Sequence, residues 1–157
     1  MSAKGSRWKA NKDKQDGGGF LRLPLSVLES RAYLDASKQA RALLIDLAMQ
    51  YKGNNNGDLC VAWKLMHPRG WRSEATLMKA KCELLELGLI VETRKGGRPN
   101  KATLYAVTWC DLDDCGGKLE MTPRSFPRGA YKLRNPLPPM TAKITSLTTA
   151  TVVAATG

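Results

Sequence analysis

The sequence has few of the residues from which enzymes usually build an active site. Histidine occurs once among 157 residues, as His67, and its position before Pro68 at the end of a predicted helix favours a structural role. No serine or cysteine stands in a nucleophile motif, and no glycine-rich loop has the phosphate-binding pattern GxxxxGK followed by serine or threonine. We therefore expect a protein that is not an enzyme and that needs no cofactor.

Cysteine is also scarce, with only Cys60, Cys82, Cys110 and Cys115. The last two lie five positions apart among aspartates, but a zinc site commonly takes two short-spaced pairs of ligands, and no second pair is present. Disulfides belong to oxidising compartments, whereas residues 1–19 are polar and lack the apolar stretch of a secretion signal. We expect reduced thiols, no metal and a cytoplasmic location.

Long hydrophobic runs are missing, and acidic residues are in the minority. No apolar stretch approaches the roughly 20 residues of a membrane-spanning helix, so no membrane partner is expected. Against 14 Asp and Glu stand 25 Lys and Arg, which gives a formal net charge of +11. The excess is not confined to the ends, because residues 20–109 alone carry 14 basic and 8 acidic side chains. Such a domain attracts polyanions, nucleic acid above all.

The two ends of the chain differ in composition from its middle. Residues 1–19 have no hydrophobic periodicity, carry five basic side chains and end in three glycines, which predicts a disordered basic arm. Residues 118–157 are rich in proline and threonine and predict a mostly irregular tail, within which Phe126, Tyr131 and Leu133 are candidates to cover the core. The predicted domain is residues 20–117.

The first half of this domain reads as helices separated by turns. Pro24 suits the first turn of a short helix that runs to Ser30. Ser37 is a good N-cap for a long helix to about Lys52, whose apolar residues repeat every three or four positions. The glycines and asparagines of residues 53–57 predict a turn, and residues 59–61 predict a very short strand.

The second half predicts two helices and a hairpin. A short helix is expected over residues 62–67. A second N-cap, Ser73, starts a helix that stops at Gly88, the usual kind of residue after a helix end. Residues 89–93 and 103–109 are rich in β-branched side chains, and the Gly-rich basic loop 94–101 joins them into a hairpin.

The helix that starts at Ser73 has a distinctive sequence, SEATLMKAKCELLELGLI. A capping serine, a threonine, a lysine and an alanine precede a leucine-rich end and a Gly-Leu-Ile exit into the hairpin: Ser73, Thr76, Lys79, Ala80, Leu84, Gly88, Leu89 and Ile90. With SKQARALLIDLAMQYKGNNNGDL upstream, residues 20–117 resemble winged helix-turn-helix DNA-binding proteins of bacteriophages and mobile elements. The resemblance implies an α+β winged helix-turn-helix fold of three to four helices plus a β-hairpin wing, in a bacterial or phage-infected host cell.

In that fold the second helix of the motif fits the major groove, and the wing reaches the backbone or an adjacent groove. The function expected is therefore double-stranded DNA binding, by a transcriptional regulator or by a replication or maintenance factor of a phage or mobile element. The expected DNA-contacting residues lie around the start of the helix and on the wing: Arg69, Arg72, Ser73, Thr76, Lys79, Lys95, Arg98, Asn100 and Lys101.

A second interpretation stays open. Winged helices also serve as protein-interaction modules, and the basic surface would then meet an acidic partner, as in a phage-encoded modulator of a host protein. A homodimer through the first long helix or the C-terminal segment, and a protein partner for the C-terminal tail, are equally compatible with the sequence.

Overall fold

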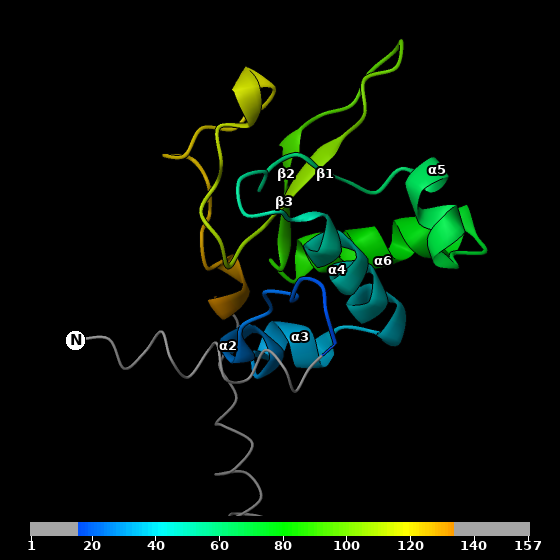
Figure 1. The fold of residues 1–157 in the computed structure, drawn as a ribbon, viewed down its shortest axis with the longest axis vertical. Helices are drawn as coiled ribbons and strands as arrows, with labels where there is room; N and C mark the ends of the chain where they lie inside the picture. Colours follow the sequence, from blue (N-terminus) through cyan, green and yellow to red (C-terminus); the bar gives the residue numbers. More distant parts are fainter. Residues whose placement is uncertain (1–15, 134–157) are drawn as a thin grey trace, which may run out of the picture.

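A computed structural model describes residues 16–133 of the chain as a mixed α+β fold (Figure 1). The parts of the predicted basic arm and tail at residues 1–15 and 134–157 lie outside the described residues. The elements, in chain order, are α2 (Leu25–Leu28), α3 (Arg31–Asp35), α4 (Lys38–Gln50), β1 (Leu59–Cys60), α5 (Trp63–Met66), the 3₁₀ turn η2 (His67–Arg69), α6 (Glu74–Glu86), β2 (Ile90–Arg94), β3 (Leu104–Val107), and the 3₁₀ turns η3 (Cys115–Gly117) and η4 (Ala130–Lys132).

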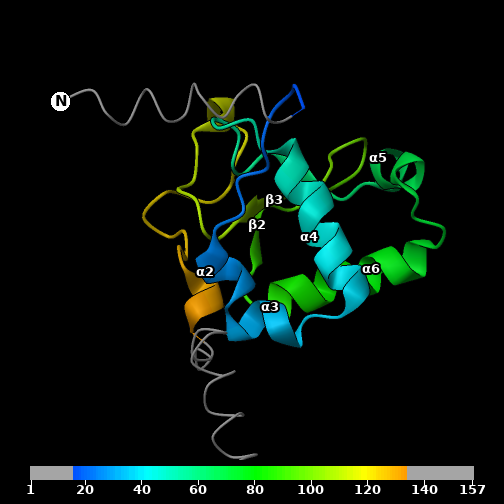
Figure 2. The same ribbon diagram turned by 60° about the horizontal axis from the view of Figure 1, so that its bottom comes forward.

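The two long helices, α4 and α6, pack against each other and against the sheet (Figures 1 and 2). The predicted N-cap of α4 is confirmed, because the Ser37 hydroxyl accepts the Ala40 N–H at 3.2 Å. The predicted apolar stripe is buried, with Leu43, Leu44 and Leu47 fully inaccessible. The helix ends two residues earlier than predicted, at Gln50.

Helix α6 has the predicted limits. The Ser73 hydroxyl accepts the Thr76 N–H at 3.3 Å, and Leu77 and Leu84 are fully buried on the side facing α4. Gly88 ends the helix with a φ of 73°. A Cβ at this position would lie 2.9 Å from the Ala130 carbonyl oxygen, so the exit from α6 needs glycine both for its backbone angle and for its space.

The sheet is antiparallel and has the order β1-β3-β2. In its register Leu59 lies opposite Tyr105, and Ile90 opposite Val107. All four residues of the central strand β3 are buried, as expected for a strand that has neighbours on both edges. An irregularity between Glu92 and Arg94 shifts the pairing just before the hairpin loop.

The chain before α4 departs from the prediction of one short helix. It forms two, because Ser30 has an extended backbone with a ψ of 149° and starts α3 by accepting the Tyr33 N–H. The helix predicted over residues 62–67 also differs: α5 covers Trp63–Met66 and continues as the 3₁₀ turn η2, which Gly70 ends with a φ of 99°.

Residues 118–133 are largely irregular, as predicted, yet they pack on the domain beyond residue 117. Tyr131 is buried, and its hydroxyl lies 3.3 Å from that of Ser26 on α2. The Gly129 N–H donates to the Thr108 carbonyl at 2.7 Å. Of the other two candidates for covering the core, Phe126 is half-buried and Leu133 is 87% exposed. Within the described residues, the packed unit therefore extends at least to Tyr131.

The buried side chain of Asn56 joins the turn after α4 to the end of β3. Its amide nitrogen donates to the carbonyls of Val107 (3.0 Å), Cys110 (3.3 Å) and Asp111 (2.9 Å), and its amide oxygen accepts the Val107 N–H at 2.9 Å. Its backbone exchanges two further hydrogen bonds with Asp113. One asparagine thus satisfies several backbone groups that have no strand partner.

None of the helices within residues 16–133 combines the length and the apolar character needed to cross a membrane.

We expect Asn56→Ala to lower the free energy of unfolding by about 3 kcal/mol, because the Val107 N–H and three carbonyls would lose their partner in a buried site. Asn54→Ala is the matched control: it lies in the same turn, is exposed, and should change stability by less than about 0.5 kcal/mol. Urea unfolding followed by circular dichroism measures both. If the two variants lowered the free energy of unfolding equally, the hydrogen bonds of the Asn56 side chain would not stabilise the fold.

Candidate nucleic-acid interface

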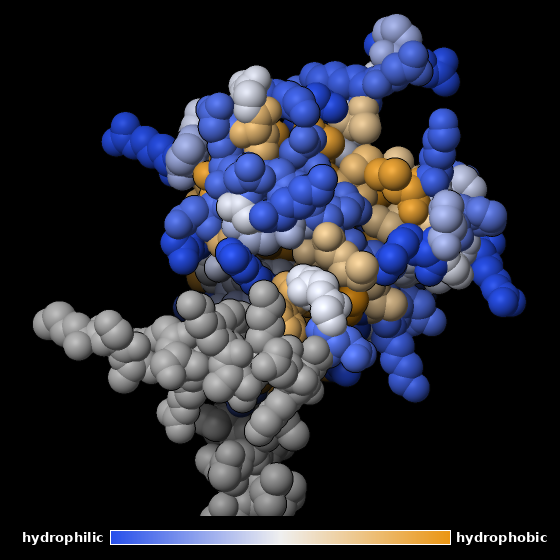
Figure 3. Space-filling view, in the orientation of Figure 1, coloured by the Kyte–Doolittle hydropathy of each residue, from blue (hydrophilic) through white to orange (hydrophobic). Residues whose placement is uncertain are grey.

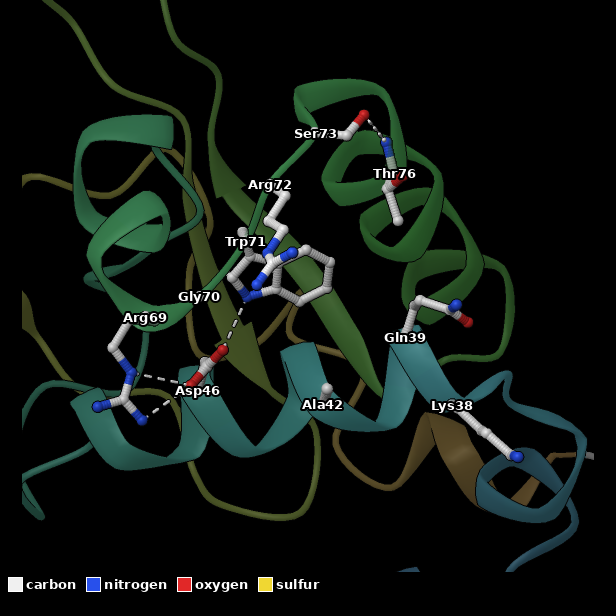
Figure 4. Close-up of a pocket in the computed structure, with 10 residues that line it drawn as sticks. All are labelled: Lys38, Gln39, Ala42, Asp46, Arg69, Gly70, Trp71, Arg72, Ser73 and Thr76. Atoms are coloured by element: carbon white, nitrogen blue, oxygen red, sulfur yellow. Dashed lines mark hydrogen bonds and ion pairs between the residues drawn. The ribbon is translucent and has the colours of Figure 1, made fainter.

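The turn that leads into α6 is held in place by Asp46 on α4. The Asp46 carboxylate accepts the Trp71 indole N–H at 2.8 Å and the Arg69 Nε–H at 3.0 Å (Figure 4). Only 12% of the Asp46 side chain is exposed, against 45% for Arg69. Arg69 and Trp71, on either side of Gly70 in this turn, bond to the same carboxylate. The start of α6 is therefore held in position against α4.

A second bond fixes α6 further along. The Glu83 carboxylate accepts the backbone N–H of Ser37 at 2.6 Å and its hydroxyl at 2.7 Å. A carboxylate at the N-terminus of α4 also interacts favourably with that helix's dipole. Glu83 therefore attaches α6 itself to α4, and Asp46 attaches the turn that leads into α6.

An open groove of about 410 Å³ runs between the start of α4 and the start of α6. Lys38 and Gln39 line one wall, and Ser73 and Thr76 line the other, with Arg72 between them (Figure 4). Ala42, Asp46 and Trp71 line it as well, so its lining mixes apolar, acidic and basic side chains, and the groove lies directly beside the N-terminal end of α6.

The predicted contact residues around the start of α6 are all exposed, but they are not equally available. The charged side chains of Arg72 and Lys79 make no hydrogen bond or ion pair with another described residue. Arg69 is already bonded to Asp46, and the Ser73 hydroxyl caps the helix. Thr76 lies at the edge of the groove.

The hairpin between β2 and β3 presents the remaining predicted residues. Gly97 and Lys101 pair across its tip, where their backbones exchange two hydrogen bonds of 2.9 Å. Asn100 takes a left-handed φ of 62° at the turn. The charged groups of Lys95 and Arg98 are exposed and have no partner among residues 16–133.

The side-chain ammonium of Lys101 is paired with the carboxylate of Glu120. One Glu120 oxygen accepts from the Lys101 ammonium at 2.8 Å, and the other accepts the Lys95 backbone N–H at 3.1 Å. The Glu120 and Met121 N–H groups donate in turn to the Thr93 carbonyl. The hydrogen bond from Lys101 lowers the pKa of the Glu120 carboxyl, and the Lys95 N–H adds to this effect. Residues 120 and 121 thus hold the base of the hairpin.

In Figure 1 the hairpin tip lies at the upper right and the N-terminal end of α6 at the right, with α5 between them in that view. The space-filling view shows hydrophilic surface over both, with smaller apolar areas between them (Figure 3).

Sequence reasoning identified the exposed cations but missed their acidic partners. Asp46 lies 23 positions before Arg69, and Glu120 lies 19 positions after Lys101. No local spacing rule links positions so far apart, so these pairings had no signal in the sequence. The capping serines, in contrast, acted through bonds three residues away and were predictable.

The thiols of Cys110 and Cys115 are partly buried, and burial raises the pKa of each. Burial also raises the pKa of Tyr105, to about 12. Cys82 on α6 is exposed. Within residues 16–133, no three His, Cys, Asp or Glu side chains come together as a metal site.

We expect Glu120→Gln to loosen the hairpin tip, since it removes the charge that holds Lys101 and keeps the shape of the side chain. Amide exchange at Gly97 and Lys101, followed by NMR at pH 7, should accelerate by up to about fivefold, the effect of one exposed ion pair. Glu92→Gln is the control, because Glu92 is exposed on the same hairpin and its carboxylate makes no hydrogen bond within the described chain.

The same contact should respond to pH. Because the folded pKa of Glu120 is lowered, the contact stabilises the hairpin above the ordinary glutamate pKa of roughly 4.3, and this contribution is lost as pH falls through the folded pKa. The difference between wild type and Glu120→Gln should therefore vanish in acid. A difference that persisted there would mean that shape, and not charge, holds the hairpin.

Comparison of the chain with protein-family models, with curated proteins and with solved structures finds no match. The features of the candidate interface are a helix start held by Asp46, cations without partners beside it, and a basic hairpin.

Proposed function

We propose that the chain is a winged helix-turn-helix protein that binds double-stranded DNA. The order of elements supports the proposal: α4, β1, α5, α6, β2, hairpin loop and β3 follow one another, and the sheet order is β1-β3-β2. In this arrangement α5 and α6 form the helix-turn-helix, and the β2–β3 hairpin is the wing.

The observation that carries the proposal is the availability of positive charge at α6 and on the hairpin. Arg72 and Lys79 at α6, and Lys95 and Arg98 on the hairpin, have charged groups with no partner among the described residues. Five other cations of the described chain are neutralised in ion pairs: Arg31, Arg69, Lys101, Lys118 and Arg128. Unpaired cations on two projecting elements suit a polyanion with regularly spaced phosphates.

The docking mode follows from this geometry. The first turns of α6 enter the major groove, where Lys79 reaches a base edge and Thr76 lies beside it. Arg72 and the N-terminal N–H groups of α6 face phosphates. The hairpin lies along the backbone through Lys95 and Arg98. Because α6 is attached to α4 through Asp46 and Glu83, the helix enters the groove without having to reorganise.

In this proposal the biological role is transcriptional regulation, or replication or maintenance of a phage or mobile element. Both roles need a protein that prefers one site over random DNA. The decisive experiment is a titration of the full chain against random and selected duplexes at several salt concentrations. Affinity that falls steeply with the logarithm of salt, together with preference for one sequence, supports the proposal. No duplex binding at 50 mM salt overturns it.

The alternative of a protein-interaction module has one observation in its favour. A second groove, of about 460 Å³, lies between α4 and α5, and Met49 and Leu65 at its edges are 54% and 52% exposed. Exposed apolar side chains around a groove suit a protein segment. Absence of duplex binding would make this surface the leading candidate.

We expect Lys79→Ala to weaken binding to the preferred duplex by about 1–3 kcal/mol, the size of one base-edge contact. Binding to random DNA should change much less. Arg124→Ala removes one exposed charge from outside α6 and the hairpin, and it should leave the preference intact. If both variants lost affinity equally for all sequences, Lys79 would be a backbone contact and not a reader of bases.

The double change Lys95→Ala and Arg98→Ala should weaken binding to all duplexes and lower the salt slope by about 1.8, which is 0.9 for each phosphate contact. Lys101→Ala, on the same hairpin, should lower it by less than 0.9, because Glu120 already neutralises that ammonium. Affinities measured between 50 and 200 mM salt give the slopes. Equal effects of Lys101 and Arg98 changes would contradict the assigned roles.

A further inference from the structure

The outward face of α6 carries a ridge that the basic residues do not explain. Ala75, Met78, Lys79 and Cys82 are spaced by three or four positions, and all are exposed. They lie opposite the buried positions Leu77, Ala80 and Leu84. Positions i, i+3, i+4 and i+7 of a helix share one face, so these four side chains form a continuous strip, here named the reading ridge.

The chemistry of the reading ridge is mainly apolar. Lys79 is its one charged member. Met78 is 45% exposed although it is a large hydrophobic residue, and the Lys81 ammonium lies 3.2 Å from its sulfur. Alanine, methionine and cysteine offer a base edge no strong hydrogen bond. They can instead exclude water from an apolar group.

We propose that the reading ridge recognises thymine methyl groups in the major groove, with Met78 as the principal contact. This inference rests on the proposed DNA-binding function. The C5 methyl of thymine is the one apolar group among the features that the four bases display in the major groove, and small apolar side chains are its usual partners. Lys79, between the apolar members, bonds to an acceptor on a neighbouring base.

The dimensions of the ridge suit this role. From Ala75 to Cys82 the helix rises by about 10 Å at 1.5 Å per residue, which matches roughly three base pairs. Glu86, one turn further, is exposed on the same side. The DNA phosphates would repel its negatively charged carboxylate. The base-reading part of α6 is therefore its first half, which is also the part that Asp46 fixes.

The residues around the reading ridge favour DNA over a protein as its binding partner. Arg72 directly precedes the Ser73 cap of the same helix, and Lys95 and Arg98 are exposed on the hairpin with no partner for their charged groups among the described residues. An apolar strip on a single helix, flanked by unpaired cations, matches a groove whose floor carries methyl groups and whose rims carry phosphates.

The test replaces thymine by uracil, which removes only the methyl group. The full chain first enriches duplexes from a random 20-base-pair library, and each thymine of the enriched site is then changed to uracil in turn. We expect at least one position at which affinity falls about three- to fivefold, the effect of one buried methyl. In Met78→Ala this loss should disappear, whereas Leu65→Ala, an equally exposed residue on α5, should retain it.

Cys82 gives an independent readout of the same face. Its thiol is exposed, while those of Cys110 and Cys115 are partly buried with raised pKa values, so alkylation at pH 7 should mark Cys82 first. The enriched duplex should slow alkylation of Cys82 at least tenfold, and a random duplex should slow it less.

The outcomes separate this inference from the function on which it rests. Enrichment and duplex binding without any effect of uracil would overturn methyl recognition and leave DNA binding intact. Uracil sensitivity that persists in Met78→Ala would also overturn it, because another residue would then hold the methyl. Failure to bind any duplex would overturn both, and undiminished alkylation of Cys82 in the complex would remove the reading ridge from the interface.

Discussion

Asn56 is the connection through which the helices and the sheet keep their relative positions. The turn after α4 would otherwise leave the end of β3 with unpaired backbone groups in the interior, where each costs free energy. An asparagine amide offers two donors and an acceptor with two lone pairs, and this one uses them on Val107, Cys110 and Asp111. Since β3 carries the hairpin and α4 packs on α6, Asn56 adds a polar link between the two basic elements to the shared core and the direct contact of α6 with β2.

Much of the fold could be predicted because its determinants are local. The serine caps at Ser37 and Ser73 and the apolar stripes of α4 and α6 act within one or two helical turns, and these elements begin where predicted. The missed features depend on distant partners. Nothing local distinguishes Asn56 from the two asparagines before it, and the packing of Tyr131 depends on α2, more than 100 positions earlier.

The features of the candidate interface also divide into those that follow from local sequence and those that depend on distant partners. That Arg72, Thr76 and Lys79 would be exposed followed from helix periodicity, and the hairpin position of Lys95 and Arg98 followed from its glycines. Which cations are neutralised did not follow, because Asp46 and Glu120 reach Arg69 and Lys101 only in three dimensions. The sequence thus predicts where charge lies along the chain, whereas the fold decides which charges a ligand meets.

The contact between η4 and the first helices has a consequence for how the chain folds. Tyr131 closes against Ser26 across 105 positions, and loop closure over so long a stretch costs little extra free energy, because each doubling adds only about 0.6 kcal/mol. It does slow folding, since contacts between residues far apart in the sequence form late. At roughly 5–20 residues per second of synthesis, η4 leaves the ribosome several seconds after α2. During that interval α2 and α3 lack the covering that Tyr131 provides, so the side of these helices that η4 contacts stays open until residue 131 has emerged.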